Sequence, residues 1–501
     1  MSGIRVTYAG LINFIIGIIS VITGLAFTLT VTRQLSQDEL GTWGLIGGLL
    51  VYATIISPII DYWLTRDIAR GGKSGKTGII SSGFFSVIGF AVLVILSYFV
   101  SLGSDASFDI LLLGVVLVPV MFMQKVLHAI NMAWKPETRS YGLIVFETVK
   151  LPVGILLIYL LDLGLVGAIF TVFIAHLGEI ILLAYYAREK IRVSFETSYL
   201  KKWFRISSLP MYGNLQNFIL SLDVVIFTLI TSSVIGLAFY TVSMASVAIV
   251  NHANAISFAL YSKLLEGGKR EHLQENLINV LFFALPLLVL SISFSKPTLF
   301  ALNPLYVEAW PIAIVLAFKM LLHIVRDIFE AGIAAIERVD VNEQSTWKDY
   351  AKSKLFFLPT LRVIQNGLFV GTLFVVLIIF VNQGASDLDL VFYWSIVALI
   401  MQIPFTLYTY HLARSSFTIK IPKIPIAKYI IVSVGSIGLS YILFEKFVFY
   451  DTSVFNFLPN LLIFMTLGLG LYLTITYFVD SRTKNLVQKV KSEIFSKKFT
   501  N

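Results

Sequence analysis

Long apolar segments recur along the whole chain, and short polar gaps separate them. Each segment is long enough to cross a hydrocarbon core about 30 Å thick as a helix of about 20 residues. The pattern predicts an all-α polytopic membrane protein with about 14 transmembrane helices. Pro58 falls within the second span and predicts a kink there. The predicted spans are residues 9–32, 41–62, 79–101, 110–133, 141–161, 165–187, 207–230, 235–260, 277–294, 309–336, 359–381, 390–412, 429–446 and 457–478.

The basic residues alternate from one gap to the next and thereby orient the helices. Thirty of the 38 lysines and arginines lie in the N-terminal segment, in the gaps after even-numbered spans, or in the C-terminal tail, whereas the opposite gaps hold only Arg33 and Lys296. Cytoplasmic loops of membrane proteins carry such an excess of Lys and Arg. We therefore expect a multi-pass protein of the cell (plasma or inner) membrane with both termini in the cytoplasm. The basic segments 188–206, 337–358 and 480–501 predict helices that lie at the interface.

Composition excludes several classes of function. The chain is 57% hydrophobic and 13% charged, and it contains no cysteine, which rules out disulfides and thiolate chemistry. Its net charge of +9 is spread over many short loops, which fits attraction to anionic lipid headgroups better than binding of nucleic acid. No phosphate-binding loop, metal-ligand spacing or nucleophile motif is present, and the external gaps are too short for a catalytic domain. We expect a protein that is not an enzyme and has no cofactor or metal.

Three pairs of short motifs indicate an internal repeat. Asn13 and Asn217 lie in similar strings, Gly41 and Gly236 begin the second span of each half, and similar strings around Ala129 and Ala331 end the fourth, at offsets of 204, 195 and 202 residues. An even number of spans separates the copies, which predicts two six-helix lobes related by a pseudo-two-fold axis along the membrane normal. The expected domains are lobes 1–190 and 207–412, a cytoplasmic linker 191–206, two additional helices in 413–478, and a basic tail 479–501.

Ionisable residues inside the predicted spans are candidates for function, because a charge at mid-bilayer costs about 2.5–3.5 kcal/mol. Span 309–336 is the richest, and its charged residues share one helix face. Arg326 could pair with Glu330, and His323 with Asp327, at i,i+4. This face predicts either the lining of a cavity or static ion pairs between helices. The cavity candidates are Lys125, Lys150, Lys319, His323, Arg326, Glu330, Asn13 and Asn217.

Four further carboxylates are candidates for ion coupling. They are Glu147, Glu179, Asp223 and Asp327. A structural alternative exists for each group: Glu147 and Lys150 could simply neutralise each other, the histidines could be satisfied packing residues, and Asp223 could anchor a helix. The charges concentrate toward the inner leaflet in both halves, which suits a substrate collected from the cytoplasmic face.

Several short motifs together resemble the Wzx-type polysaccharide flippases of the multidrug/oligosaccharidyl-lipid/polysaccharide (MOP) exporter superfamily. The matching segments are Leu209–Asp223, Gly236–Tyr240, Tyr261–Leu265 with Ser262 in the family's proline position, Tyr306–Pro311, Arg33–Trp43 and Arg66–Arg70. The resemblance implies that an oligosaccharide linked to polyprenyl phosphate or pyrophosphate moves from the inner to the outer leaflet by alternating access. It also implies glycan-assembly enzymes as partners.

Two other functions remain open at this point. A multidrug exporter of the related MATE type would exchange protons or sodium for cationic drugs, and twelve spans would favour it. A non-transporting assembly protein predicts that neutralising Lys319 or Arg326 changes nothing. The mixture of Lys and Arg with Asp and Glu departs from the purely cationic cavity expected for a pyrophosphate.

Overall fold

The computed structural model describes residues 23–135, 137–205, 207–257, 271–337, 347–417, 419, 421 and 423–485, and within these ranges it contains helices and no strand. In these ranges eleven helices are long and apolar enough to cross a membrane, and the count is twelve if the bent pair α2 (Gln37–Ala53) and α3 (Ser57–Ala69) is taken as one span. Predicted span 309–336 is the long helix α16 (Trp310–Ala335), which is too charged for that criterion. Residues 23–34 are helical, and the rest of span 9–32 lies outside the described residues. The predicted all-α membrane fold is confirmed.

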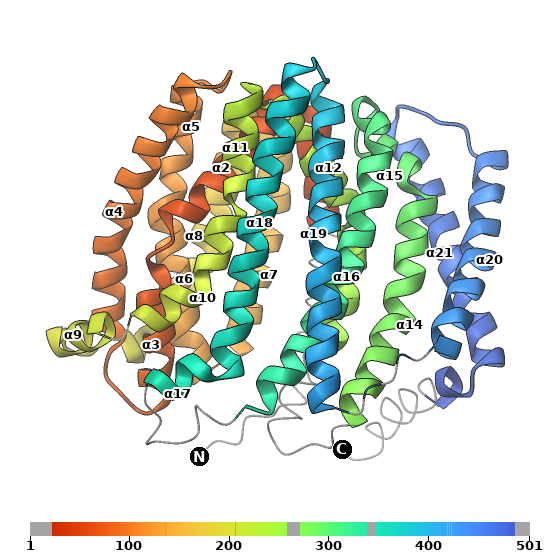
Figure 1. Cartoon of the computed structure of the whole chain (residues 1–501). Helices are drawn as coiled ribbons and strands as arrows, with labels where there is room; N and C mark the ends of the chain where they lie inside the picture. The colour runs from red at the N-terminus through yellow and green to blue at the C-terminus, as the bar shows by residue number, and fades with distance from the viewer. Residues whose placement is uncertain are drawn as a thin grey trace, which may run out of the picture. The chain divides into compact units, whose positions relative to one another are not determined.

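The first compact unit comprises Met1–Thr241 and Pro359–Trp394. After residues 23–34 and the pair α2 and α3, its helices are α4 (Gly75–Leu102), α5 (Phe108–Leu113), η1 (Gly114–Val116), α6 (Leu117–Trp134), α7 (Glu137–Gly154), η2 (Ile155–Leu160), α8 (Gly164–Ile191), α9 (Thr197–Arg205), α10 (Ser208–Leu220) and α11 (Leu222–Thr231). It also includes the first part of α12 (Ile235–Val247) and most of α18 (Lys354–Asn382). Figure 1 shows α4, α6 and α8 running nearly parallel within this unit.

The second unit comprises Val242–Leu358 and Ser395–Asn501. Its described helices are η3 (Ala248–Ser257), α14 (Glu271–Ser293), α15 (Ser295–Leu302), η4 (Pro304–Ala309), α16, α17 (Trp347–Lys352), the later part of α19 (Asp387–Ser416), α20 (Lys423–Phe447) and α21 (Val454–Val479). The last two helices pack on each other and on α14, where the Tyr472 hydroxyl donates to the Phe282 carbonyl at 2.8 Å. These units divide the chain at other positions than the predicted lobes, whose boundaries stay a prediction.

A bend of 61° separates α2 from α3 within what the sequence predicts as one span. The Thr54 hydroxyl donates to the Leu50 carbonyl at 2.9 Å and helps to close the end of α2. Pro58 stands in the first turn of α3, where its missing N–H breaks no helical hydrogen bond. The kink predicted from Pro58 is therefore present. Because of this kink, the helix that begins at Ser57 faces α6.

Glycines allow α2 to approach its neighbours closely. A Cβ atom at Gly41 would lie 1.9 Å from the Val234 carbonyl oxygen, and one at Gly48 would lie 3.1 Å from the Val224 side chain. At the start of α2, Ser36 and Glu39 form a capping box. Glu39 also accepts from the Leu165 backbone N–H at 3.0 Å, so one carboxylate caps the N-termini of both α2 and α8.

We expect Gly41→Ala to reduce the folded fraction in the membrane, whereas Gly47→Ala should be neutral or slightly stabilising. The first change forces backbone atoms apart at a cost of about 1–3 kcal/mol or more. A Cβ at Gly47 meets nothing within 4 Å, so that variant gains only the better helix propensity of alanine, up to about 1 kcal/mol. Thermal unfolding of both proteins in detergent measures the difference, and equal midpoints would contradict this account of the α2 contact.

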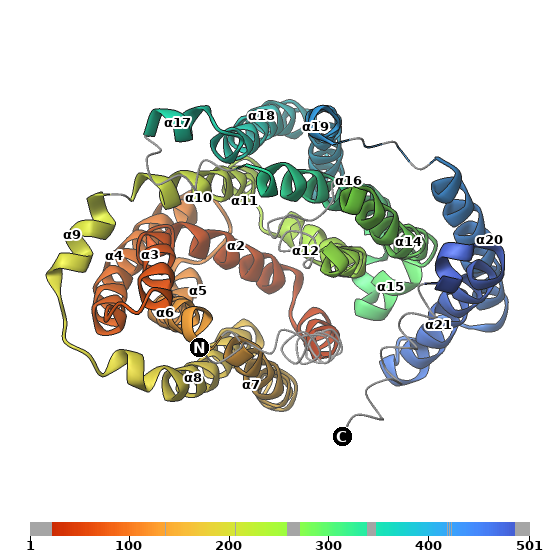
Figure 2. The same ribbon diagram turned by 90° about the horizontal axis from the view of Figure 1, so that it is seen from below.

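The short amphipathic helix α9 lies across one end of α3 and α4 (Figures 1 and 2). Buried Asp67 on α3 accepts from the Trp203 indole N–H at 2.7 Å and pairs with the Lys202 ammonium at 2.9 Å. Phe204 is exposed beside Phe85 of α4, and Arg205 is exposed as well. An exposed aromatic ring next to exposed cations is typical of a helix at the membrane interface, as the sequence predicts for this segment.

Candidate functional site

A cavity of about 490 Å³ lies inside the first unit, between the α2–α3 bend, α6 and α10. Its size is in the range of small-ligand sites. The walls are mainly apolar, with Leu50 and Phe218 among them, and polar groups enter at a few places. Lys125 is the one charged residue among those that line this cavity in the described part of the chain. The other polar side chains of the lining are Thr54, Asn214, Asn217 and Ser221.

The sequence of α10 places its polar side chains on one stripe. Asn214, Asn217 and Ser221 follow each other at intervals of three and four residues, which is one face of a helix. Asn214 donates to the Pro210 carbonyl at 3.3 Å, and the Ser221 hydroxyl donates to the Asn217 carbonyl at 3.0 Å. The Asn217 side chain is exposed and donates to Asn214 Oδ1 at 3.4 Å.

Lys125 reaches the cavity from α6 and is held by the first turn of α3. Its ammonium donates to the Ser57 hydroxyl at 3.3 Å and interacts electrostatically with Asp61, one turn further along α3. Among the described residues, Oδ1 of Asp61 is buried without a hydrogen-bond partner. Asp61 is absent from the sequence-based candidates because it stands at the predicted end of an apolar span. Only the bend after Ala53 carries it to a position opposite Lys125.

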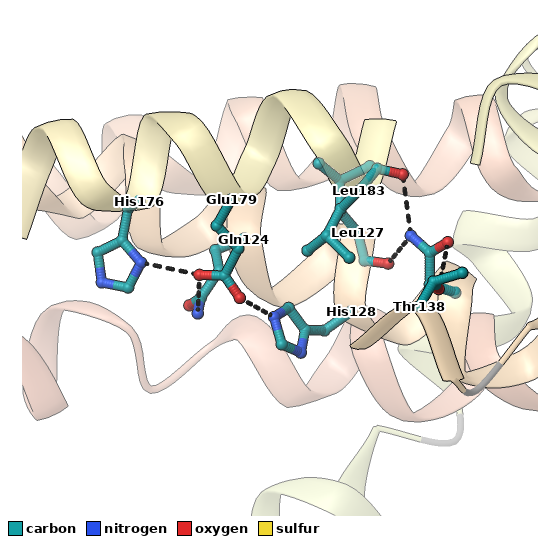
Figure 3. Close-up of polar contacts among 8 residues, drawn as sticks. Gln124, Leu127, His128, Thr138, His176, Glu179 and Leu183 are labelled. Atoms are coloured by element: carbon teal, nitrogen blue, oxygen red, sulfur yellow. Dashed lines mark hydrogen bonds and ion pairs between the residues drawn. The ribbon is translucent and has the colours of Figure 1, made fainter. Parts of the chain in front are cut away.

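A second polar cluster joins α6 to α8 (Figure 3). Glu179, with only 3% of its side chain exposed, is surrounded by three partners. Its Oε1 lies 2.7 Å from His128 Nε2, and its Oε2 accepts from the Gln124 amide at 3.0 Å and lies 3.2 Å from His176 Nδ1. We refer to these four residues as the Glu179 cluster. Glu179 and His176 are neighbours along one helix, whereas Gln124 and His128 arrive from another.

A third charged pair lies on α7 next to the helix of residues 23–34. The Lys150 ammonium is 2.8 Å from Glu147 Oε2, and the Thr23 hydroxyl donates to the same oxygen at 2.8 Å. Both charged residues are buried. The ammonium also lies over the rings of Phe27 and Phe146, at 5.3 and 4.9 Å from their centroids. Glu147 and Lys150 are thus paired with each other, and the choice between self-neutralisation and substrate contact stays a prediction.

The charged face of α16 lies in the second unit. Both predicted i,i+4 pairs are present: Arg326 Nε contacts Glu330 Oε1 at 2.5 Å, and His323 Nε2 lies 3.4 Å from Asp327 Oδ2. Arg326 and Glu330 are buried, whereas His323 is exposed. The predicted single face is therefore divided between a buried pair and a more exposed one, and Lys319 is half-buried.

The two remaining candidates are Asp223 and Asn13. Asp223 is buried in the first turn of α11, where its Oδ1 accepts from the Val224 backbone N–H at 2.8 Å, and its role stays a prediction. Asn13 lies outside the described residues. Among the residues that the structure describes, no three His, Cys, Asp or Glu side chains are arranged to hold a metal ion.

No protein-family model matches the chain, and no curated protein matches it in sequence. Solved structures are similar in fold. The lipid II flippase MurJ in an inward closed conformation is 15% identical with a TM-score of 0.61, covering 95% of this chain and 100% of that chain. A multidrug resistance MATE family transporter of the MOP superfamily matches in an inward-facing conformation, at 15% identity and a TM-score of 0.57, over 81% of this chain and 98% of that one.

An outward-facing structure of a multidrug resistance MATE family transporter is also similar, at 16% identity and a TM-score of 0.52, over 82% of this chain and 95% of that one. At these identities the comparisons establish the fold alone. The chain is a multi-span membrane protein with the fold of MOP-superfamily transporters.

Proposed function

We propose that the chain is a transporter that moves an oligosaccharide linked to polyprenyl phosphate or pyrophosphate from the cytoplasmic to the outer leaflet by alternating access. The observation that carries this proposal is the cavity of the first unit, in which one cation and several amide and hydroxyl groups lie within an apolar wall. An ammonium group binds phosphate oxygens through charge-assisted hydrogen bonds. Amide and hydroxyl side chains donate to and accept from sugar hydroxyls.

The charge of the lining distinguishes this substrate class from cationic drugs. Lys125 would repel a cationic ligand, and its partner Asp61 is not among the lining residues. The extent of the structural match supports the same choice. The MurJ structure covers 95% of this chain and the two MATE structures cover 81% and 82%, so a larger part of the chain has a counterpart in the flippase fold.

Reconstituted vesicles can test the function directly. We expect purified full-length protein to expose a fluorescent oligosaccharide linked to polyprenyl pyrophosphate on the opposite leaflet, where an added glycosidase or a membrane-impermeant quencher reaches it. The matched samples are empty vesicles and vesicles with a cationic dye in place of the lipid. Extrusion of the dye without movement of the lipid would replace this function with multidrug export. If neither compound moves, the proposal that the chain transports these substrates is wrong.

A further inference from the structure

We propose that the Glu179 cluster is a proton-binding site. Each neutral histidine ring carries one proton on a ring nitrogen, and His128 and His176 together bind one additional proton, which is exchangeable. An ionised carboxylate only accepts hydrogen bonds, so the ring nitrogens that face Glu179 carry protons. When both rings are neutral, Glu179 still accepts all of its hydrogen bonds within the cluster, but the cluster has a net charge of −1. One further proton on either ring converts it into a neutral imidazolium–carboxylate group without breaking a hydrogen bond.

The outward ring nitrogens are available for that proton. Each histidine uses one nitrogen toward Glu179, and among the described residues His128 Nδ1 and His176 Nε2 have no hydrogen-bond partner. Neither atom belongs to the fully buried, unpaired polar atoms of the described chain. The side chains of His128 and His176 are 21% and 14% exposed, whereas that of Glu179 is only 3% exposed. The two rings are therefore more exposed than the carboxylate that lies between them (Figure 3).

Within the described ranges, no lysine or arginine is ion-paired with Glu179. On α7, Lys150 is paired with Glu147. Phe146 separates that pair from the cluster, since its ring lies 4.6 Å from the His176 ring and 4.9 Å from the Lys150 ammonium. On α6, Lys125 is directed to Ser57 and Asp61 of α3. The helices α2 and α4 carry their charged residues only in their first turns, as Asp38, Glu39 and Lys76.

A buried net charge is costly in a medium of low polarity, so uptake of a proton is the direct way to neutralise the cluster. Histidine is the side chain whose charge changes between about pH 5 and 8. The cluster also shares α6 with the cavity, because His128 follows Lys125 by three residues. A link between proton occupancy and substrate movement rests on the proposed function, whereas the proton site itself rests on the geometry of the four residues.

Proton uptake by the purified full-length protein tests the site without any substrate. The protein, in weakly buffered detergent solution with an indicator dye, is moved from pH 8 to pH 5.5, and bound protons are counted. The variant His128→Gln/His176→Gln retains amide donors to Glu179, and we expect it to take up fewer protons than the wild type by about one. Glu179→Gln should also take up less, because the imidazolium loses its counter-charge.

Thr138→Val is the matched control, because it removes a hydrogen bond from α7 to Asn131, three residues after His128 on α6, and leaves both imidazoles and Glu179 in place. Its proton uptake should equal that of the wild type. Equal uptake by the wild type and the double-histidine variant, both monodisperse, would overturn the proposal, as would unchanged uptake in Glu179→Gln. A wild type that binds the proton but moves no glycan lipid would refute only the transport function.

Discussion

Replacing Lys125 with methionine is expected to lower the rate of glycan-lipid translocation by about 10- to 100-fold. The change removes the one cation of the described cavity lining while it keeps a flexible side chain of similar length. A hydrogen bond to a charged group contributes about 1.5–3 kcal/mol, which corresponds to that range of rates when the interaction is lost. Lys125→Arg should retain more activity than Lys125→Met because it keeps the charge. Initial rates in reconstituted vesicles measure each effect.

Because the carboxylate of Asp61 lies next to Lys125, a second variant is needed. Lys125→Met leaves Asp61, which is partly buried, without its cation, so a loss of folded protein could imitate a loss of transport. Asp61→Asn/Lys125→Met removes both charges and should fold while it remains slow. Lys446→Met, at an exposed position near the end of α20, controls for the loss of a cation elsewhere in the membrane. If the double variant transports at the wild-type rate, Lys125 is only a structural partner of Asp61 and is not needed for transport.

The helices themselves were predictable because the apolar segments are long and the gaps between them are short. Predicted span 79–101 is α4 (Gly75–Leu102), and predicted span 457–478 is α21 (Val454–Val479). The differences lie at the ends, where helices continue by several residues past the apolar core into the polar gap. The i,i+4 pairs on α16 could be predicted equally well, because the spacing of neighbours along one helix is fixed by geometry.

Contacts between helices could not be derived in the same way. Lys125 and Asn217 are both predicted as cavity candidates, but nothing in the sequence indicates that α6 and α10 border one cavity. His176 and Glu179 are neighbours along α8, whereas the approach of His128 depends on how α6 packs against α8. Asp61 is the clearest omission. An acidic residue at the end of an apolar run is ordinarily the boundary of a span, and only the bend between α2 and α3 places it against Lys125.

Replacing Lys150 with methionine is expected to destabilise the protein by about 3–5 kcal/mol, because it leaves a buried carboxylate without its cation. Of its side-chain contacts with described residues, Glu147 would then retain the hydrogen bond from the Thr23 hydroxyl. Thermal unfolding in detergent, followed by the monodisperse fraction after heating, measures the loss. Lys202→Met provides a contrast, since its ammonium also lies 2.9 Å from a carboxylate but 49% of its side chain is exposed. A pair that water reaches contributes only about 0–1 kcal/mol.

The double variant Glu147→Gln/Lys150→Met identifies the cause of that loss. If the uncompensated charge of Glu147 is responsible, the neutral glutamine can still accept from Thr23, and the double variant should regain most of the stability that Lys150→Met loses. If it remains as unstable as the single variant, the lost contact of the ammonium with the rings of Phe27 and Phe146 is the larger contribution. Recovery would mean that Glu147 and Lys150 serve mainly to neutralise each other, and that their charges are not used to bind a substrate.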